Sequence, residues 1–365
     1  MAEALERPSL LEFVRRSKQE RISWAMTSPG LTSSRFETAR IFVYFCRIRT
    51  CVPGMLAFYL ACVILSVPMS WTVAAGLLIA FCYSAAANLF NAYTDVVEDN
   101  ENMPSRVYLL GLIGRRRLLA SAYLVSASMI AAAVVTGRPF FIGLTVLCIA
   151  VAHQYSMRPL RAKARPFVSV LIFSLDVGLP FLLGGVLAGR ETSTAERSGF
   201  VAIGVYLVLW FSAKALVKNL PDFEGDEAAG LRTTATIFGS RHKAGVWAAG
   251  ATAVVYASPL VLVLLGLIDT MYLATLLWLP VVGAQCWRMV NRLSAQASNN
   301  MLRSDMWLSI GYLMTWIVLT DASLSTVAVL AVAVLTIVIA DGFQLDTRRT
   351  IDVASKDSGF DESGQ

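Results

Sequence analysis

Charged residues are scarce in this chain: Asp, Glu, Lys and Arg make up only 15% of the 365 residues, against 56% hydrophobic residues. A soluble globular domain carries about 25% charged residues, so the composition excludes an ordinary water-soluble fold. Apolar runs approaching or exceeding about 18 residues, the length that crosses a bilayer as a helix, recur along the whole chain. Because lipid cannot hydrogen-bond to the backbone, such runs must be helical. We therefore predict an all-α integral membrane protein.

Cysteine and histidine are also few, and their positions exclude several kinds of site. No two cysteines have CxxC spacing and the two histidines share no motif; these residues are Cys46, Cys51, Cys62, Cys82, Cys148, Cys286, His153 and His242. Scattered cysteines in or beside apolar runs are typical of small core residues. Neither a disulfide framework nor zinc or haem ligation is indicated.

The apolar runs predict ten spans, separated by short polar connections. They lie near residues 52–67, 71–90, 118–136, 139–156, 167–188, 198–217, 245–267, 271–290, 306–320 and 323–341. Only Thr320-Asp321 divides the last two, so we expect nine or ten transmembrane helices. Together they predict a polytopic membrane bundle over residues 38–341, around a central cavity open to the cytoplasmic side.

Basic residues orient this bundle, because loops rich in Lys and Arg stay on the cytoplasmic side. Nine Lys or Arg precede residue 50, and the loops after the second, fourth and sixth spans are basic, whereas the opposite loops hold only Arg138, Arg190 and Arg197. The net charge of +6 therefore reflects topology and requires no nucleic acid. We expect residues 1–37 to form a polar, amphipathic surface segment with a helix around Leu10–Arg21, and residues 342–365 a polar mobile tail.

Two acidic clusters interrupt the otherwise apolar sequence, each where a long apolar run ends. The first runs from Asn91 to Asp99 and the second from Asp222 to Asp226. On a helix, residues four apart lie on one face, so Asp95 and Asp99 share a face, as do Asp222 and Asp226. Like charges so placed repel unless a cation lies between them, and oxygen ligands suit Mg²⁺. The pattern favours a metal site at the membrane boundary.

Acidic residues at a membrane interface are usually only solvated, so the clusters need a second indication. Each follows polar residues within its apolar run, Asn88 and Asn91 in one case and Lys214 and Lys218 in the other. A charge at membrane depth costs ~2.5–3.5 kcal/mol on insertion scales, and such residues are functional by default. We therefore interpret both clusters as parts of one site for a metal-bound phosphate, with the two aspartate pairs within roughly 10 Å of each other.

The motifs resemble those of the UbiA superfamily of intramembrane prenyltransferases. Residues 87–99 look like the first signature of that superfamily, and residues 218–226, with Gly230 and Thr233 after them, look like the second. The stretch from Tyr155 to Lys163 resembles the loop between them. The order and spacing of these motifs agree with the superfamily over residues 40–320.

This resemblance implies two Mg²⁺ ions that bridge the diphosphate of an isoprenyl donor to the aspartates. It assigns catalytic roles to Asp95, Asp99, Asp222 and Asp226, and metal ligation to these four with Asn88 and Asn91. The diphosphate is expected to bind Arg106, Tyr155, Arg161, Lys163, Lys218 and Arg232. For each basic residue the alternative is an anchor that fixes topology, and for Tyr155 an interfacial aromatic. Asp176, deep in an apolar stretch, is expected either to orient or deprotonate an acceptor, or to pair with a basic residue on a neighbouring helix.

Three functions remain open at this point. The first is transfer of the prenyl chain to a small acceptor, which we expect to be aromatic, with release of diphosphate. The second is a terpene cyclase of the same superfamily, which needs no acceptor. The third is a transporter. A transporter would have its intramembrane charges at the bilayer midplane, whereas the charges of this chain cluster at one interface. The expected partners are an isoprenyl diphosphate, an acceptor and membrane lipid; protein partners cannot be inferred.

Overall fold

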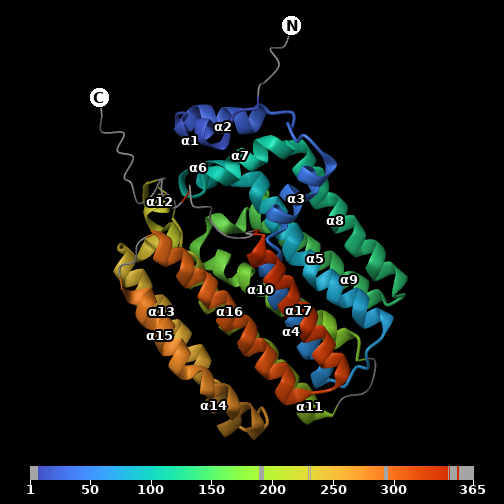
Figure 1. Cartoon of the computed structure of the whole chain (residues 1–365). Helices are drawn as coiled ribbons and strands as arrows, with labels where there is room; N and C mark the ends of the chain where they lie inside the picture. Colours follow the sequence, from blue (N-terminus) through green and yellow to red (C-terminus); the bar gives the residue numbers. More distant parts are fainter. Residues whose placement is uncertain are drawn as a thin grey trace.

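Long helices run side by side through most of the molecule, and the described residues contain no strand (Figure 1). The computed structural model describes residues 7–188, 193–228, 230, 232–291, 295–343, 345 and 352. The fold is therefore all-α, as the composition predicts. Most of the tail expected at residues 342–365 lies outside the described residues.

The helices fall into a group of long segments and a group of short ones. The long ones are α3 (Arg35–Cys46), α4 (Ile48–Ile64), α5 (Trp71–Thr94), α8 (Arg115–Val135), α9 (Pro139–Ser156), α10 (Pro166–Val186), α11 (Thr194–Lys218), α13 (Arg241–Ala257), α15 (Leu279–Val290), α16 (Ala295–Thr320) and α17 (Leu324–Gly342). The short ones are α1 (Leu10–Arg15), α2 (Lys18–Thr27), α6 (Val96–Asn102), α7 (Pro104–Ile113), η1 (Ala162–Ala164), η2 (Leu220–Asp222), α12 (Phe223–Ala228), η3 (Thr236–Phe238), α14 (Pro259–Leu264) and η4 (Thr270–Trp278).

All ten apolar segments expected from the sequence are helical. Among the described residues, eight segments are long and apolar enough to cross a membrane, and the number is nine if α3 and α4, bent by 55°, form one span. The bend falls at Arg47, which has left-handed backbone angles (φ 50°). α16 is not among these nine but packs against α4 within the bundle. It ends at Thr320, where the sequence predicts the division from the last span.

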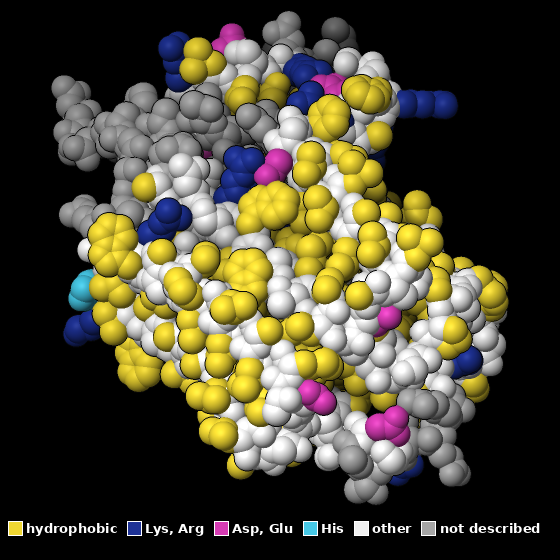
Figure 2. Space-filling model, turned by 60° about the horizontal axis from the view of Figure 1, so that its bottom comes forward, with side chains coloured by type: hydrophobic (Ala, Val, Ile, Leu, Met, Phe, Trp, Pro, Cys, Tyr) yellow, Lys and Arg dark blue, Asp and Glu magenta, His cyan; other side chains and the backbone are white. Residues whose placement is uncertain are grey.

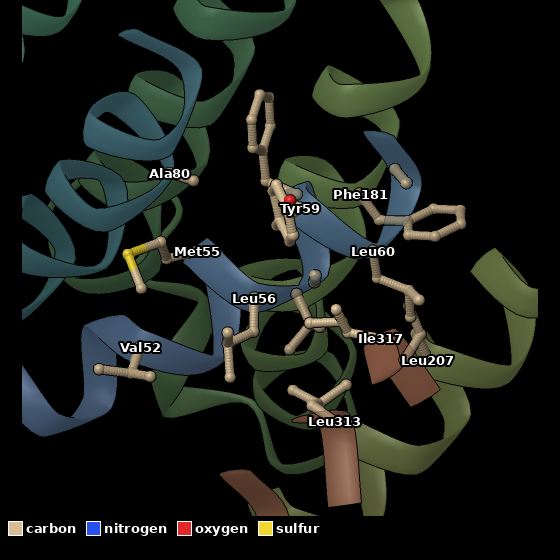
Figure 3. Close-up of a cluster of buried hydrophobic side chains, with 14 of the residues drawn as sticks. Val52, Met55, Leu56, Tyr59, Leu60, Ala80, Phe181, Leu207, Leu313 and Ile317 are labelled. Atoms are coloured by element: carbon tan, nitrogen blue, oxygen red, sulfur yellow. The ribbon is translucent and has the colours of Figure 1, made fainter. Parts of the chain in front are cut away.

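The bundle packs around α4, whose side chains are buried along almost its whole length. Figure 3 shows Met55, Leu56 and Leu60 of α4 among side chains from α5, α10, α11 and α16. Close approach depends on small residues: a Cβ at Gly184 of α10 would come within 2.4 Å of the Phe58 carbonyl oxygen. Small residues at helix contacts are typical of membrane bundles, where they let backbones approach closely.

The outer surface of the bundle is apolar. Phe140, Leu277 and Leu324 are more than 80% exposed, and hydrophobic side chains cover much of the face seen in Figure 2. Soluble monomers rarely expose contiguous apolar patches larger than a few hundred Å². The surface therefore fits a lipid environment, and the protein is a multi-pass membrane protein.

The short helices α1, α2, α6, α7 and α12 gather at one end of the bundle (Figure 1). We call this end the site end, because both acidic motifs lie there. The single N-terminal helix expected around Leu10–Arg21 is divided into α1 and α2, which begin at separate capping boxes on Ser9 and Ser17. A Ser N-cap followed three residues later by Glu forms a capping box, which favours the start of a new helix.

Candidate active site

A cavity of about 220 Å³ lies inside the bundle, between α4, α5, α9, α10, α11 and α16. Six of the predicted site residues line it: Asn88, Asn91, Tyr155, Asp176, Lys218 and Asp222. Part of the wall is aromatic, with the rings of Phe173 and Phe211 stacked at 5.0 Å. The cavity thus combines polar groups with an apolar lining, as small-molecule sites do.

The first acidic motif lies where α5 ends and α6 begins. Asp95 separates the two helices, with φ −90° and ψ 26°, although its N–H still donates to the Asn91 carbonyl oxygen at 2.9 Å. The Asp95 carboxylate forms an ion pair with Lys163, whose ammonium also donates to Thr94 Oγ1 at 3.0 Å. Burial, and then the charge of Lys218, lower the pKa of Lys163, whereas the contact with Asp95 favours its charged form.

Asp99 lies one turn further, on α6, and is buried (7% exposed). Arg106 of α7 donates to it at 3.2 Å. Burial raises the pKa of Asp99; Arg106 and Arg47 oppose this shift, while Asp222 and Glu98 add to it. Within the described part of the chain, Nε and Nη2 of Arg106 are buried without a hydrogen-bond partner. This guanidinium therefore has donors that none of the described residues accepts.

The second acidic motif is also interrupted. α11 ends at Lys218, a 3₁₀ turn carries Asp222, and the short α12 carries Asp226. Pro221 lies in this turn, and its missing N–H and fixed φ disfavour an uninterrupted α-helix. Each motif is therefore divided between two helical segments, although Asp95 and Asp99, like Asp222 and Asp226, remain about one turn apart.

The two motifs nevertheless meet at the site end. α6 and α12 are in contact, and Asp222 is close enough to Asp99 to raise its pKa. Asp222 lines the cavity directly, while Asp226 is buried (7% exposed). Segments far apart in the sequence thus bring like charges together around one end of the cavity.

These residues fit a magnesium ion bound together with substrate. The described residues contain no group of three carboxylate, imidazole or thiol side chains placed to hold a metal by themselves. Mg²⁺ usually binds one or two carboxylates and completes its shell with water and substrate phosphates. Converging aspartates, with Asp95 paired to Lys163 and Asp99 to Arg106, match that pattern.

The two asparagines are held in defined orientations. Asn88 donates through its amide nitrogen to the Cys46 carbonyl oxygen at 3.0 Å and to Thr50 Oγ1 at 2.8 Å. Asn91 accepts a bond from Ser156 Oγ at 3.0 Å. Both line the cavity. Asn91 precedes Asp95 by about one helical turn and Asn88 by about two.

Two predicted diphosphate ligands lie away from the cavity. Arg161 is ion-paired with Glu98 at 2.9 Å, and its side chain is 42% exposed. Arg232 is exposed and does not line the cavity. Arg106 and Lys163 also lie outside the cavity lining but contact the first acidic motif, whereas Tyr155 and Lys218 line it.

Five charged residues of the cavity lining were given no catalytic, metal or diphosphate role from the sequence. They are Arg47, Arg49, Lys214, Arg303 and Asp305. Lys214 and Asp305 form a buried ion pair at 2.8 Å, with the ammonium 4.9 Å from the centre of the Tyr256 ring. Lys214 precedes Lys218 by one helical turn, so its position in the same row was a usable signal; nothing near Asp305 indicated its partner.

Asp176 of α10 lines the cavity deep in the bundle and accepts a hydrogen bond from Ser84 Oγ at 2.7 Å. Among the described residues its hydrogen-bond partner is thus a hydroxyl on a neighbouring helix. A carboxylate with only a hydroxyl donor retains acceptor capacity.

Comparison with known proteins places these features in a family. The chain matches the UbiA prenyltransferase family over residues 51–311. It is 28% identical over 247 residues to a digeranylgeranylglyceryl phosphate synthase of Methanothermobacter thermautotrophicus, an alignment that covers 67% of this chain and 83% of the relative. It is 34% identical over 98 residues to a lycopene elongase/hydratase of Corynebacterium glutamicum, covering 27% of this chain and 32% of that protein.

Solved structures show the same fold. A UbiA homologue from Archaeoglobus fulgidus bound to DMAPP and Mg²⁺ superposes with a TM-score of 0.57, at 18% sequence identity, covering 80% of this chain and 99% of that one. A digeranylgeranylglyceryl phosphate synthase structure gives 0.54, at 16% identity over 78% of this chain and 99% of that one. With a match over most of its length, and the two acidic motifs joined at one cavity, this chain belongs to the UbiA prenyltransferase family.

Proposed function

We propose that this prenyltransferase is Mg²⁺-dependent, that it ionises an isoprenyl diphosphate at the site end, and that it transfers the prenyl chain to a small acceptor. The observation that carries the proposal is the meeting of α6 and α12, which brings both acidic motifs to one end of a cavity inside the bundle. Because the basic loops flank the same motifs, the site faces the cytoplasm.

The metal ligands in this proposal divide by motif. Asp95 and Asp99, with Asn91 and Asn88 behind them, would hold one ion, and Asp222 and Asp226 would hold the other. When bound, Mg²⁺ would offset the negative charge that develops on the departing diphosphate. A related structure contains Mg²⁺ together with DMAPP, which supports the choice of metal.

The basic residues bind the diphosphate and hold its charge as the C–O bond breaks. Lys218 lines the cavity beside Asp222, and Lys163 and Arg106 contact the first motif. Tyr155 lines the cavity, and in this proposal it donates a hydrogen bond to the diphosphate. Arg161 and Arg232 have a weaker part, since one is bound to Glu98 and the other is exposed.

The acceptor enters deeper in the cavity, towards Asp176. When the allylic C–O bond breaks, a new bond forms from the allylic carbon to the acceptor, and the acceptor's proton passes to the Asp176 carboxylate. The expectation from the sequence is an aromatic acceptor. Several relatives are named digeranylgeranylglyceryl phosphate synthases. A prenylated glyceryl phosphate is therefore the first acceptor to test, ahead of an aromatic ring.

The decisive experiment is incubation of the purified protein and Mg²⁺ with geranyl, farnesyl or geranylgeranyl diphosphate. Each donor is supplied alone, with geranylgeranylglyceryl phosphate, and with a hydroxylated benzoate. A prenylated acceptor with stoichiometric diphosphate release supports the proposal and identifies the acceptor. A cyclic hydrocarbon formed from the donor alone would instead establish the terpene cyclase. Absence of donor binding would refute both.

A further inference from the structure

Residues 7–31 cover the site end outside the segment that matches the family, which begins at residue 51. They contain α1 and α2, which contact α6 and α7 (Figure 1). We call residues 7–31 the N-terminal clamp. The helices beneath the clamp carry Asp99 and Arg106.

The clamp holds α6 through polar contacts beside Asp99. Arg21 donates from Nε to Asn100 Oδ1 at 2.9 Å, and Asn100 is only 2% exposed. Lys18 forms an ion pair with Glu101 at 3.2 Å. Both contacts fall on the two residues that follow Asp99 in α6.

The clamp holds α7 through apolar packing and backbone hydrogen bonds. Trp24 stacks on Tyr108, with ring centroids 5.8 Å apart, and covers Gly111 so closely that a Cβ there would lie 1.9 Å from the indole. Ser28 Oγ donates to the Gly111 carbonyl oxygen at 2.7 Å, and the Leu31 N–H donates to the Leu112 carbonyl oxygen at 2.7 Å. These contacts follow Arg106 along α7.

Arg106 therefore lies between the two sets of clamp contacts, and Asp99 directly precedes the first set. α6 has 7 residues and α7 has 10, and helices shorter than about 12 residues are marginal on their own. Their positions must be set by the elements that they pack against. A group fixed before substrate arrives does not lose conformational entropy on binding, which improves affinity.

We propose that the N-terminal clamp is a positioning element of the active site, with Arg21 and Trp24 as its positioning residues. It holds α6 and α7 so that Asp99 and Arg106 are already arranged for an isoprenyl diphosphate. This inference rests on the proposed function, since it names the ligand as the donor of that reaction.

The test compares Arg21→Ala and Trp24→Ala with two matched controls in the full chain. Arg15→Ala removes an exposed arginine of α1, and Met26→Ala truncates a side chain of α2 that is 43% exposed. Arg21→Lys is the conservative variant. The probe is geranylgeranyl thiolodiphosphate with Mg²⁺, which binds without reacting, and its Kd is measured by calorimetry.

Loss of a residue that orients metal or substrate ligands typically weakens binding by about 10–100-fold. We expect Kd to rise by that factor in Arg21→Ala and Trp24→Ala, to recover in part in Arg21→Lys, and to stay unchanged in both controls. The KM for the donor should rise more than kcat falls. Amide hydrogen exchange over residues 95–113 should accelerate in the two clamp variants while exchange in α4 is unchanged, which separates local loosening from global unfolding.

Two results would overturn the inference, and they differ from each other. If the unsubstituted protein binds the probe and both clamp variants bind it equally well, the clamp does not position the site and the proposed function stands. If the unsubstituted protein binds neither this probe nor the geranyl and farnesyl thiolodiphosphates with Mg²⁺, the proposed function fails and the inference fails with it.

Discussion

Lys163 contacts the carboxylate of Asp95, and this ion pair joins the loop after α9 to the break between α5 and α6. The same ammonium donates to Thr94 Oγ1 at 3.0 Å. The contact ties the first acidic motif to the middle of the three segments in which the sequence resembles UbiA proteins. The Lys163 ammonium also offsets the negative charge of Asp95, a carboxylate that we propose as a metal ligand.

Replacing Asp95 or Asp222 by Ala should lower kcat at least about a hundredfold, the scale lost when one stabiliser of a developing anion is removed. Each carboxylate belongs to a different motif, so each variant tests one metal. Release of diphosphate from the donor is the measurement.

Glu98→Ala is the matched control for these variants. Glu98 binds Arg161, whose side chain is 42% exposed, and we assign no metal to Glu98. Its loss should therefore change turnover far less than loss of Asp95. Equal effects would mean that α6 presents a different face to the substrate.

Removing divalent metal with EDTA should abolish diphosphate release, and adding Mg²⁺ should restore it. The converging aspartates repel a diphosphate unless cations lie between them. The control is the same titration on Asp222→Ala, which should need more Mg²⁺ for any residual turnover. Full turnover by the unsubstituted protein in metal-free buffer would contradict the assigned mechanism.

Substituting one partner of the Lys214–Asp305 ion pair should destabilise the protein more than substituting both. Both side chains are nearly buried, at 5% and 6% exposed, and removal of one partner from a buried pair costs about 3–5 kcal/mol because the other charge is left uncompensated. Lys214→Met and Asp305→Leu should each lower the thermal unfolding midpoint in detergent.

The double variant of these two positions should recover most of the lost stability, because apolar replacement of both partners of a buried pair is often neutral or stabilising. Single variants as stable as the unsubstituted protein would show that water reaches the pair through the cavity.

The helices could be predicted because their signal is local. The run at 139–156 coincides with α9, and Thr320-Asp321 marks the division of α16 from the last helix. The bend at Arg47 and the break at Asp95 were not visible, since neither position holds a proline or glycine. Pro221 was a local signal for the turn in the second motif, and it was not used.

The site could be predicted only where its residues share a motif. The aspartates and asparagines lie at helical spacing in the sequence, and both motifs reach the same end of the bundle. Contacts between distant segments have no such pattern. The pairing of Arg161 with Glu98, of Lys214 with Asp305 and of Arg21 with Asn100 depends on tertiary packing, so the parts of the site on α16 and in the clamp required the structure.

Asp176→Asn should separate donor chemistry from acceptor chemistry. The amide keeps the shape of the side chain and can still accept the bond from Ser84, but it cannot take a proton from the acceptor. Loss of a proton acceptor in the transition state typically costs about 10²–10⁴ in rate. We therefore expect prenyl transfer to fall by at least about a hundredfold while the Kd for geranylgeranyl thiolodiphosphate is unchanged. Ser84→Ala is the control, since it removes the hydrogen bond and leaves the carboxylate. If Asp176→Asn transfers the prenyl group as fast as the unsubstituted protein, the proton leaves by another route and Asp176 only supports the cavity wall.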